Sequence, residues 1–291
     1  MSGPQVSVLG AVLSVLPDWI HPRQDASVVP RGVIINHCTV PGVVALTFDD
    51  GPYKYTSHVL DLLDQYDAKA TFFVNGDNWV QGIDNESQPW PSILRRMVRS
   101  GHQVGSHTFS HVDMTSADSD MRYQQLHNLE ESLTNVLGVY PAYFRPPYAT
   151  CDGDCLTEVE DMGYHVVNFD IDTKDYANNR RNTIQNSKDI FSTALDAGRS
   201  NDSFLVLCHD VQKQTAMSLV QFMLDKIQEK GYRAVTVGEC LGDPTWNCAG
   251  NDGDWFNEWW NGGCEPLSRY FWRESKKSPS GGAFCSATGE W

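Results

Sequence analysis

Short apolar segments that predict strands alternate with amphipathic segments that predict helices, from about residue 32 to residue 240. Helical spacing is clearest over 56–66, 121–137 and 216–228, and Thr56 and Ser57 offer an N-cap to the first of these helices. Such alternation predicts parallel β/α units, and hence either an open doubly wound sheet or a barrel. The predicted strands cover residues 43–48, 71–74, 103–106, 142–144, 166–169, 204–207 and 234–237.

The composition changes near residue 243 of the 291-residue chain. Residues 246–291 hold six of the nine tryptophans and three of the eight cysteines, without clear periodicity. We therefore predict three parts: an N-terminal segment over 1–31, a main domain over 32–243, and an irregular Trp/Cys-rich extension over 244–291. The tryptophans of the extension could bind sugar rings, but packing against the main domain is the commoner role of this large apolar residue.

Acidic residues outnumber basic ones, 37 to 22, so the net charge is −15. Because like charges repel, we expect neither nucleic acid nor an anionic membrane surface as a partner. No apolar run approaches the ~20 residues that cross a bilayer. Eight cysteines, with glycosylation sequons at Asn85 and Asn201, favour a secreted protein. We expect it to be a monomer.

Two pairs of polar residues follow predicted strands and suggest a metal site. Asp49 and Asp50 come directly after the strand 43–48, where one carboxylate can bind a metal while the other accepts a proton. An ordinary Asp-Gly-Pro turn is the alternative. His107 and His111 are four residues apart, so two imidazoles one helical turn apart could share a metal with Asp50. Zinc is the first choice, although cobalt, nickel or iron would suit such a site, and a pair of surface histidines is the alternative.

Further polar residues follow the strands 142–144, 166–169 and 204–207. Arg145 lies in a loop stiffened by two prolines, where it could pair with Asp49 and keep that carboxylate ionised. His209 ends the last of these strands, and a histidine beside an acidic partner such as Asp172 or Asp175 is suited to general acid catalysis. An ordinary salt bridge and a capped core histidine are the alternatives.

Taken together, these segments resemble five motifs of the polysaccharide deacetylases, also called family-4 carbohydrate esterases or the NodB-homology family. The resemblance runs from about residue 32 to residue 242, with the motifs in the order of the family. It implies a distorted, incompletely closed (β/α) barrel, which agrees with the elements predicted above. The five segments are Thr47-Phe48-Asp49-Asp50-Gly51-Pro52, His107-Thr108-Phe109-Ser110-His111, Arg145-Pro146-Pro147-Tyr148, Asp172-Thr173-Lys174-Asp175-Tyr176 and Leu205-Val206-Leu207-Cys208-His209.

The resemblance also implies a role for each polar residue. The metal ion, a general base and a general acid together would remove an acetyl group by hydrolysis. Arg145 would orient the base, and Asp175 would tune the acid. The implied metal ligands are Asp50, His107 and His111, the implied base is Asp49, and the implied acid is His209.

An oxyanion site and a small apolar pocket are implied by the same resemblance. The metal and the backbone N–H of Tyr148 would stabilise the oxyanion. Leu207, Tyr148 and Tyr176 would line a pocket for the acetyl methyl group. Two residues depart from the family pattern, because Ala149 stands where many relatives have Gly, and Tyr176 where many have Trp. Both departures concern the shape of the pocket and not the reaction.

Two cysteine pairings look like those of fungal chitin deacetylases. Cys38 and Cys240 would tie the ends of the barrel together, and Cys151 with Cys155 could close a short loop or, alternatively, bind a metal. Cys208 is expected to be a buried free thiol. At most one disulfide can form among the three remaining cysteines, and its partners stay unassigned: Cys248, Cys264 and Cys285.

The implied function is that of a secreted, metal-dependent deacetylase acting outside the cell or in the cell wall. Its substrate would be the N-acetylglucosamine units of chitin or chitin oligosaccharides, and its metal Zn²⁺, with Co²⁺ or Ni²⁺ as alternatives. An acetylxylan esterase or a peptidoglycan deacetylase stays open, because ester and amide hydrolysis share this machinery. A carbohydrate-binding protein without activity, or a structural wall protein, fits less well with a complete set of motif residues.

Overall fold

The computed structural model describes residues 29–199, 201–243 and 247–249, the last three as backbone only. The predicted segment 1–31 lies outside the described residues except for 29–31, and the extension 244–291 lies outside them except for one short strand. The pairing of Cys248, Cys264 and Cys285 therefore falls outside the described side chains. Within the described ranges, no helix is both long and apolar enough to cross a membrane.

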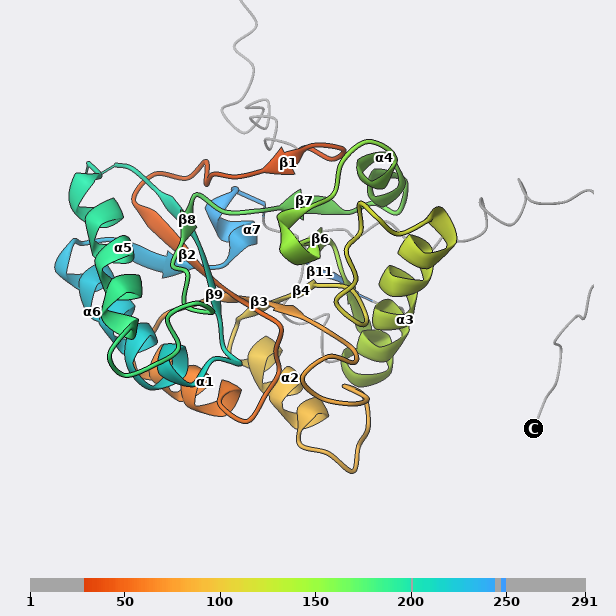
Figure 1. Cartoon of the computed structure of the whole chain (residues 1–291), viewed down its shortest axis with the longest axis horizontal. Coiled ribbons are helices and arrows are strands. Elements are labelled where there is room, and N and C mark those ends of the chain that lie inside the picture. The colour runs from red at the N-terminus through yellow and green to blue at the C-terminus, as the bar shows by residue number, and fades with distance from the viewer. Residues whose placement is uncertain (1–28, 200, 244–246, 250–291) are drawn as a thin grey trace, which may run out of the picture.

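Among the described residues, nine strands form one sheet in which all neighbours run parallel. The order is β1-β7-β6-β4-β3-β2-β9-β8, with β10 beside β2, so the curled sheet ends at β1 and β8 and does not close (Figure 1). The predicted distorted, incompletely closed (β/α) barrel is confirmed. The strands are β1 (Ile34–Ile35), β2 (Val43–Asp49), β3 (Thr71–Val74), β4 (Gln103–Ser106), β6 (Tyr143–Phe144), β7 (His165–Val167), β8 (Ile171–Asp172), β9 (Phe204–His209) and β10 (Arg233–Val235).

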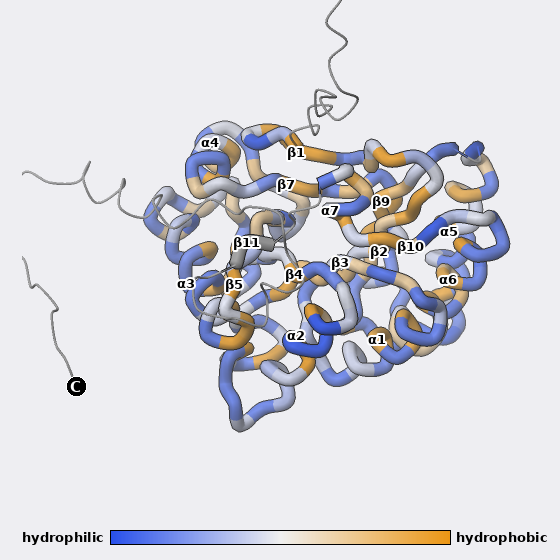
Figure 2. The backbone as a smooth tube through the Cα atoms, turned by 180° about the vertical axis from the view of Figure 1, so that it is seen from behind, coloured by the Kyte–Doolittle hydropathy of each residue, from blue (hydrophilic) through white to orange (hydrophobic). Residues whose placement is uncertain are grey.

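Helices cover the outside of the curled sheet (Figure 1). The buried residues of these helices are mainly apolar, so each helix packs one face on the strands and exposes the other. Hydrophobic and hydrophilic residues therefore alternate along the helices (Figure 2). A separate antiparallel pair joins β5 (Val139–Pro141) to β11 (Asn247–Ala249). The helices are α1 (Thr56–Gln65), α2 (Trp90–Arg99), α3 (Ser119–Leu137), α4 (Asp154–Asp161), α5 (Ile184–Ala197), α6 (Val220–Glu229) and α7 (Val237–Cys240).

Strand β2 is the central strand, and it fixes the register of the site. All seven of its residues are buried, as expected for a parallel strand covered on both faces. It pairs with β9 so that Asp49 lies level with His209, and with β3 so that Asp49 lies level with Phe73. The carboxyl ends of the central strands therefore meet at one edge of the sheet, where ligands bind in folds of this kind.

The predicted cap of α1 was wrong, and two short strands were missed. The predicted N-cap at Thr56 and Ser57 is not formed, because Tyr55 occupies that position without a side-chain cap. The Thr56 hydroxyl instead accepts a hydrogen bond from the Tyr53 N–H at 2.8 Å and donates one to Asp210. The sequence analysis also missed β1 and β8, because two residues each are too few for a periodic pattern.

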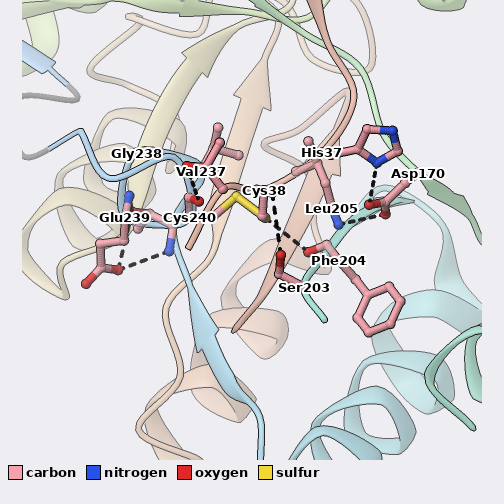
Figure 3. The surroundings of a disulfide bond; sticks show 12 residues. His37, Cys38, Asp170, Ser203, Phe204, Leu205, Val237, Gly238, Glu239 and Cys240 are labelled. Carbon is pink, nitrogen blue, oxygen red and sulfur yellow. Dashed lines mark hydrogen bonds and ion pairs between the residues drawn. A yellow bond between two sulfur atoms is a disulfide. The ribbon is translucent and has the colours of Figure 1, made fainter. Parts of the chain in front are cut away.

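Two disulfides are present among the described residues, as the resemblance implied. Cys38 bonds to Cys240, which joins the loop before β2 to the end of α7 across 202 residues (Figure 3). The Thr39 N–H donates to the Cys240 carbonyl at 2.9 Å, so the backbone bridges the same two segments. Cys151 bonds to Cys155, which excludes the alternative of a metal held by this pair. Cys208 is a buried free thiol, as expected.

Candidate functional site

A cluster of three potential metal ligands lies at the carboxyl edge of the sheet. Asp50 follows β2, and His107 and His111 lie in the loop after β4. One ligand atom from each residue lies within 4.8 Å of the others. The distance from Asp50 Oδ1 to Nε2 is 3.6 Å for His107 and 3.3 Å for His111. These donors form the two-histidine, one-carboxylate set that leaves coordination positions open.

The local chemistry of this cluster fits a cation. Asp50 Oδ1 is buried, and no hydrogen-bond donor among the described residues reaches it. An anionic oxygen without a donor is costly in a protein interior, and a bound metal ion would remove that cost. The His107 ring places Nδ1 2.7 Å from the Arg145 carbonyl, so Nδ1–H donates and Nε2 faces the cluster. Burial lowers the pKa of His107, which favours the neutral imidazole that metals bind.

The spacing argument for the two histidines was wrong in its geometry. Residues 107–111 form an irregular loop and not a helical turn. The rings nevertheless meet, with centroids 5.0 Å apart, because the loop bends through left-handed backbone at Thr108 (φ 68°) and His111 (φ 56°). Asp50 has φ 76°, so two of the three cluster residues hold a conformation that L-residues rarely adopt. Such conformations persist where the surrounding structure enforces them, often at functional sites.

Asp49 lies beside the cluster and is held by Arg145, as predicted. Its side chain is buried, and its Oδ1 accepts a hydrogen bond from Arg145 Nη1 at 2.9 Å. The guanidinium is itself fixed by donating to the carbonyls of Val167 at 3.1 Å and Asn168 at 2.7 Å. It also stacks 4.4 Å from the ring centre of Phe73. Asp49 Oδ2 is thereby left to face the cluster, 3.8 Å from His107 Nε2.

His209 pairs with Asp175 and not with Asp172. The distance from His209 Nδ1 to Asp175 Oδ1 is 2.8 Å, and the Asp175 side chain is fully buried. Burial alone would lower the pKa of His209, but the charge and hydrogen bond of Asp175, with smaller effects from Asp49 and Asp50, raise it to about 10. The imidazolium is therefore the stable form at neutral pH, as a general acid requires. Asp172 instead accepts a hydrogen bond from the Tyr176 hydroxyl at 3.0 Å.

The three residues expected to line an acetyl pocket lie near these groups. Tyr148 and Tyr176 are largely exposed, and their rings lie edge-on to His111 at 4.8 Å and to His209 at 5.5 Å. Leu207 is buried in β9, two residues before His209. A shared pocket for these residues stays a prediction. An open hollow of about 480 Å³ lies instead at the amino ends of β8 and β9, away from this cluster.

Some buried polar residues of the site were missed by the sequence analysis. Thr47 donates to the Val206 carbonyl and accepts from Arg145. Asn75 donates its side-chain amide to the carbonyls of His107 and Thr108, which supports the histidine loop. Thr215 donates to Asp175 Oδ2 at 2.6 Å. Thr47 stands in the first motif, but no pattern in the sequence singles out Asn75 or Thr215.

Comparisons with known proteins agree with this arrangement. The model of the polysaccharide deacetylase family matches residues 36–167. A chitin deacetylase of Colletotrichum lindemuthianum is 46% identical over 215 residues, which cover 74% of this chain and 86% of the relative. A chitin deacetylase of Pestalotiopsis sp is 43% identical over 225 residues, which cover 77% and 72%. The solved structure of the Colletotrichum lindemuthianum enzyme superposes with a TM-score of 0.73 over 78% of this chain and 100% of that one.

Proposed function

The chain belongs to the polysaccharide deacetylase family, and on that basis we propose that it is a metal-dependent chitin deacetylase. It hydrolyses the N-acetyl groups of N-acetylglucosamine units in chitin or chitin oligosaccharides and releases acetate. The observation that carries this function is the cluster of Asp50, His107 and His111, flanked by Asp49 on one side. The similarity to two fungal chitin deacetylases supports the choice of polymer.

Asp50, His107 and His111 would hold the metal, for which zinc is our first choice and Co²⁺ or Ni²⁺ the alternatives. When bound, the metal supplies Lewis acidity toward the acetyl carbonyl and toward water. The donor set supports zinc because imidazole and carboxylate are its common ligands in catalytic sites. The open coordination positions leave room for the substrate.

Asp49 is the proposed general base. Its Oδ1 is occupied by Arg145, so Oδ2 is the atom that accepts a proton from the attacking water. Arg145 fixes the plane of the carboxylate through this hydrogen bond. Because all of the guanidinium contacts lie in the protein interior, the base is held in place before the substrate arrives.

His209 is the proposed general acid. Its Nδ1 faces Asp175, so the proton on Nε2 is the one available to the departing nitrogen. An amine is a poor leaving group, and protonation as the C–N bond breaks is therefore essential for an amide substrate. The backbone N–H of Tyr148 would stabilise the oxyanion, and Leu207 with Tyr148 and Tyr176 would contact the acetyl methyl group.

We further propose that the protein acts outside the cell or in the cell wall, as a monomer, with 32–243 as its catalytic domain. The two disulfides support an oxidising compartment. Asn85 and Asn201 are both exposed, which supports glycosylation of their sequons.

Acetate release tests the function directly. Chitin oligosaccharides and acetylated xylan are incubated with the protein, with and without a chelator. We expect chelator-sensitive release from the chitin oligosaccharides. Release from xylan alone would indicate an esterase with the same site. No release from either substrate, with metal bound, would refute the chitin deacetylase and point to another acetylated glycan, and binding to insoluble chitin that survives metal removal would favour a carbohydrate-binding role.

Metal content tests the ligand set separately. We expect His107→Ala to lose stoichiometric metal, measured by elemental analysis of the purified protein. The control is His127→Ala, which changes a half-buried histidine of α3 that pairs with Glu130 and Glu131 and is no member of the cluster, and it should leave metal content unchanged. Unchanged metal in His107→Ala would refute the assignment.

A further inference from the structure

Asp175 is bound more completely than its pairing with His209 requires. Its Oδ1 accepts from His209 Nδ1 at 2.8 Å and from the Tyr176 N–H at 3.0 Å. Its Oδ2 accepts from the His209 N–H at 2.7 Å and from the Thr215 hydroxyl at 2.6 Å. Each oxygen thus has two donors. Of these four donors, three belong to motif residues, and only the Thr215 hydroxyl does not.

The fold places Thr215 at this carboxylate by a local irregularity. Residues Thr215–Leu219 form a π-helical segment that leads directly into α6. Wider turns of this kind are rare and are frequent at functional sites. Thr215 is the first residue of the segment and is fully buried, so its hydroxyl has no access to solvent as an alternative partner.

Hydrogen bonds fix the turn between His209 and Thr215 near both of its ends. The Gln212 N–H donates to the His209 carbonyl at 3.1 Å, and the Gln214 N–H donates to Asn179 Oδ1 at 2.8 Å. Asn179 in turn donates to the Gln212 side chain. These contacts connect the turn to the loop that carries Asp175, so Thr215 and Asp175 keep a fixed relative position.

We propose that Thr215 is a positioning residue for the proton transfer from His209. Its hydroxyl fixes Asp175 Oδ2, which leaves Oδ1 directed at Nδ1 and holds Nε2 toward the departing nitrogen. The inference rests on the proposed function. In that reaction, water adds to the acetyl carbon and gives its proton to Asp49. The C–N bond then breaks, its electron pair stays on nitrogen, and the proton on His209 Nε2 moves to that nitrogen.

Thr215→Val removes the hydroxyl and keeps the shape of the side chain. Two substrates that differ in their leaving groups distinguish a loss of His209 positioning from general damage to the active site. The amine that leaves chitin oligosaccharides needs a proton from His209. The 4-nitrophenolate ion that leaves 4-nitrophenyl acetate is stable without protonation. We expect kcat on chitin oligosaccharides to fall about tenfold, the scale of one lost hydrogen bond to a charged group, with KM unchanged. Turnover of 4-nitrophenyl acetate should change less than about twofold, since it needs no general acid.

Two control variants complete the experiment. Thr215→Ser keeps the hydroxyl and should restore turnover of chitin oligosaccharides to within about twofold of the parent. Thr71→Val removes another buried hydroxyl, which donates to Gln103 at 2.9 Å at the amino end of the sheet, and should not separate the two substrates. Equal losses on both substrates in Thr215→Val, or no loss on either, would overturn the inference. If the parent protein itself releases no acetate from chitin oligosaccharides, the proposed function fails instead.

Discussion

At the residue scale, the site consists of two ion pairs on either side of a ligand cluster. Arg145 with Asp49 and Asp175 with His209 each fix a carboxylate, but with opposite consequences. Arg145 leaves one oxygen of Asp49 available to accept a proton. Asp175 keeps His209 charged, so that it can donate one. In the proposed mechanism, the carboxylate of Asp49 is therefore itself the base, whereas that of Asp175 supports the acid, because their partners differ.

The base is tested by Asp49→Asn. The amide cannot accept a proton, so we expect turnover of chitin oligosaccharides to fall by about 10²–10⁴-fold. The three proposed ligands are unchanged, so metal content should stay stoichiometric. Both quantities are measured on one preparation. Turnover near that of the parent would rule out Asp49 as the base.

The acid is tested by the pH dependence of kcat. His209 has its pKa raised from 6.5 to about 10, so it stays protonated and able to donate through neutral pH. On the alkaline side, we expect turnover of the amide to fall as pH rises through about 10. The ion pair also stabilises the fold fully below pH 6.5, and this stabilisation is lost over the same rise to about 10.

Asp175→Asn is the matched variant for this titration. Without the carboxylate, the largest effects that raise the pKa of His209 are lost while burial still lowers it, so the alkaline limit should move to lower pH. An alkaline limit that does not move would mean that another group donates the proton.

The sequence predicted the residues of the two ion pairs better than it predicted the residues that surround them. Motif residues such as Asp49 and His209 stand at strand ends, where the carboxyl edge of a parallel sheet gathers them. Asn75 and Thr215 were missed, because their bonds join residues 32 to 40 positions apart and depend on loop conformations. The loop geometry of His107 and His111 was missed for the same reason.

At the element scale, β2 determines how well the site can be assembled. It pairs with β3, β9 and β10, so it orders strands from both ends of the chain. Long buried strands such as β2 and β3 were predictable because continuous apolar runs mark them. The two-residue strands β1 and β8 were not, because their backbone pairing arises only once the neighbouring strands are in place.

The contribution of β2 is tested by Leu46→Ala. Leu46 is fully buried in the core, so the lost contacts and the cavity should lower the free energy of unfolding by about 2–5 kcal/mol. Denaturant unfolding measures it. The control is Val33→Ala, which changes an exposed side chain and should shift stability by less than about 0.5 kcal/mol. Equal effects in the two variants would contradict this role.

At the scale of the whole molecule, side chains of two loops meet at the open side of the barrel. Strands β1 and β8 end the sheet, and the loop after β1 contacts the loop before β8 through His37 and Asp170 at 3.2 Å (Figure 3). The Cys38–Cys240 disulfide lies beside them and joins segments 202 residues apart. The sequence could place these cysteines at the two ends of the barrel, but only the fold shows that they lie next to its open side.

Removing each disulfide compares a long closed loop with a short one. Because a longer loop restricts the unfolded chain more, Cys38→Ser with Cys240→Ser should cost about 5 kcal/mol of stability. Cys151→Ser with Cys155→Ser, which opens a loop across four residues, should cost about 2 kcal/mol. Thermal unfolding ranks the two variants, and the reverse order would refute the entropic account.

Both ends of the described domain lie at the amino edge of the sheet. The Pro30 carbonyl is 2.9 Å from Nδ1 of His165, the first residue of β7, and Asp243 accepts from Tyr143, the first residue of β6, at 2.6 Å. The proposed catalytic groups occupy the opposite edge. The chain therefore enters and leaves the described domain on the side away from the proposed catalytic groups. A module joined directly at residue 30 or residue 243 would start from the edge of the sheet opposite the proposed catalytic groups.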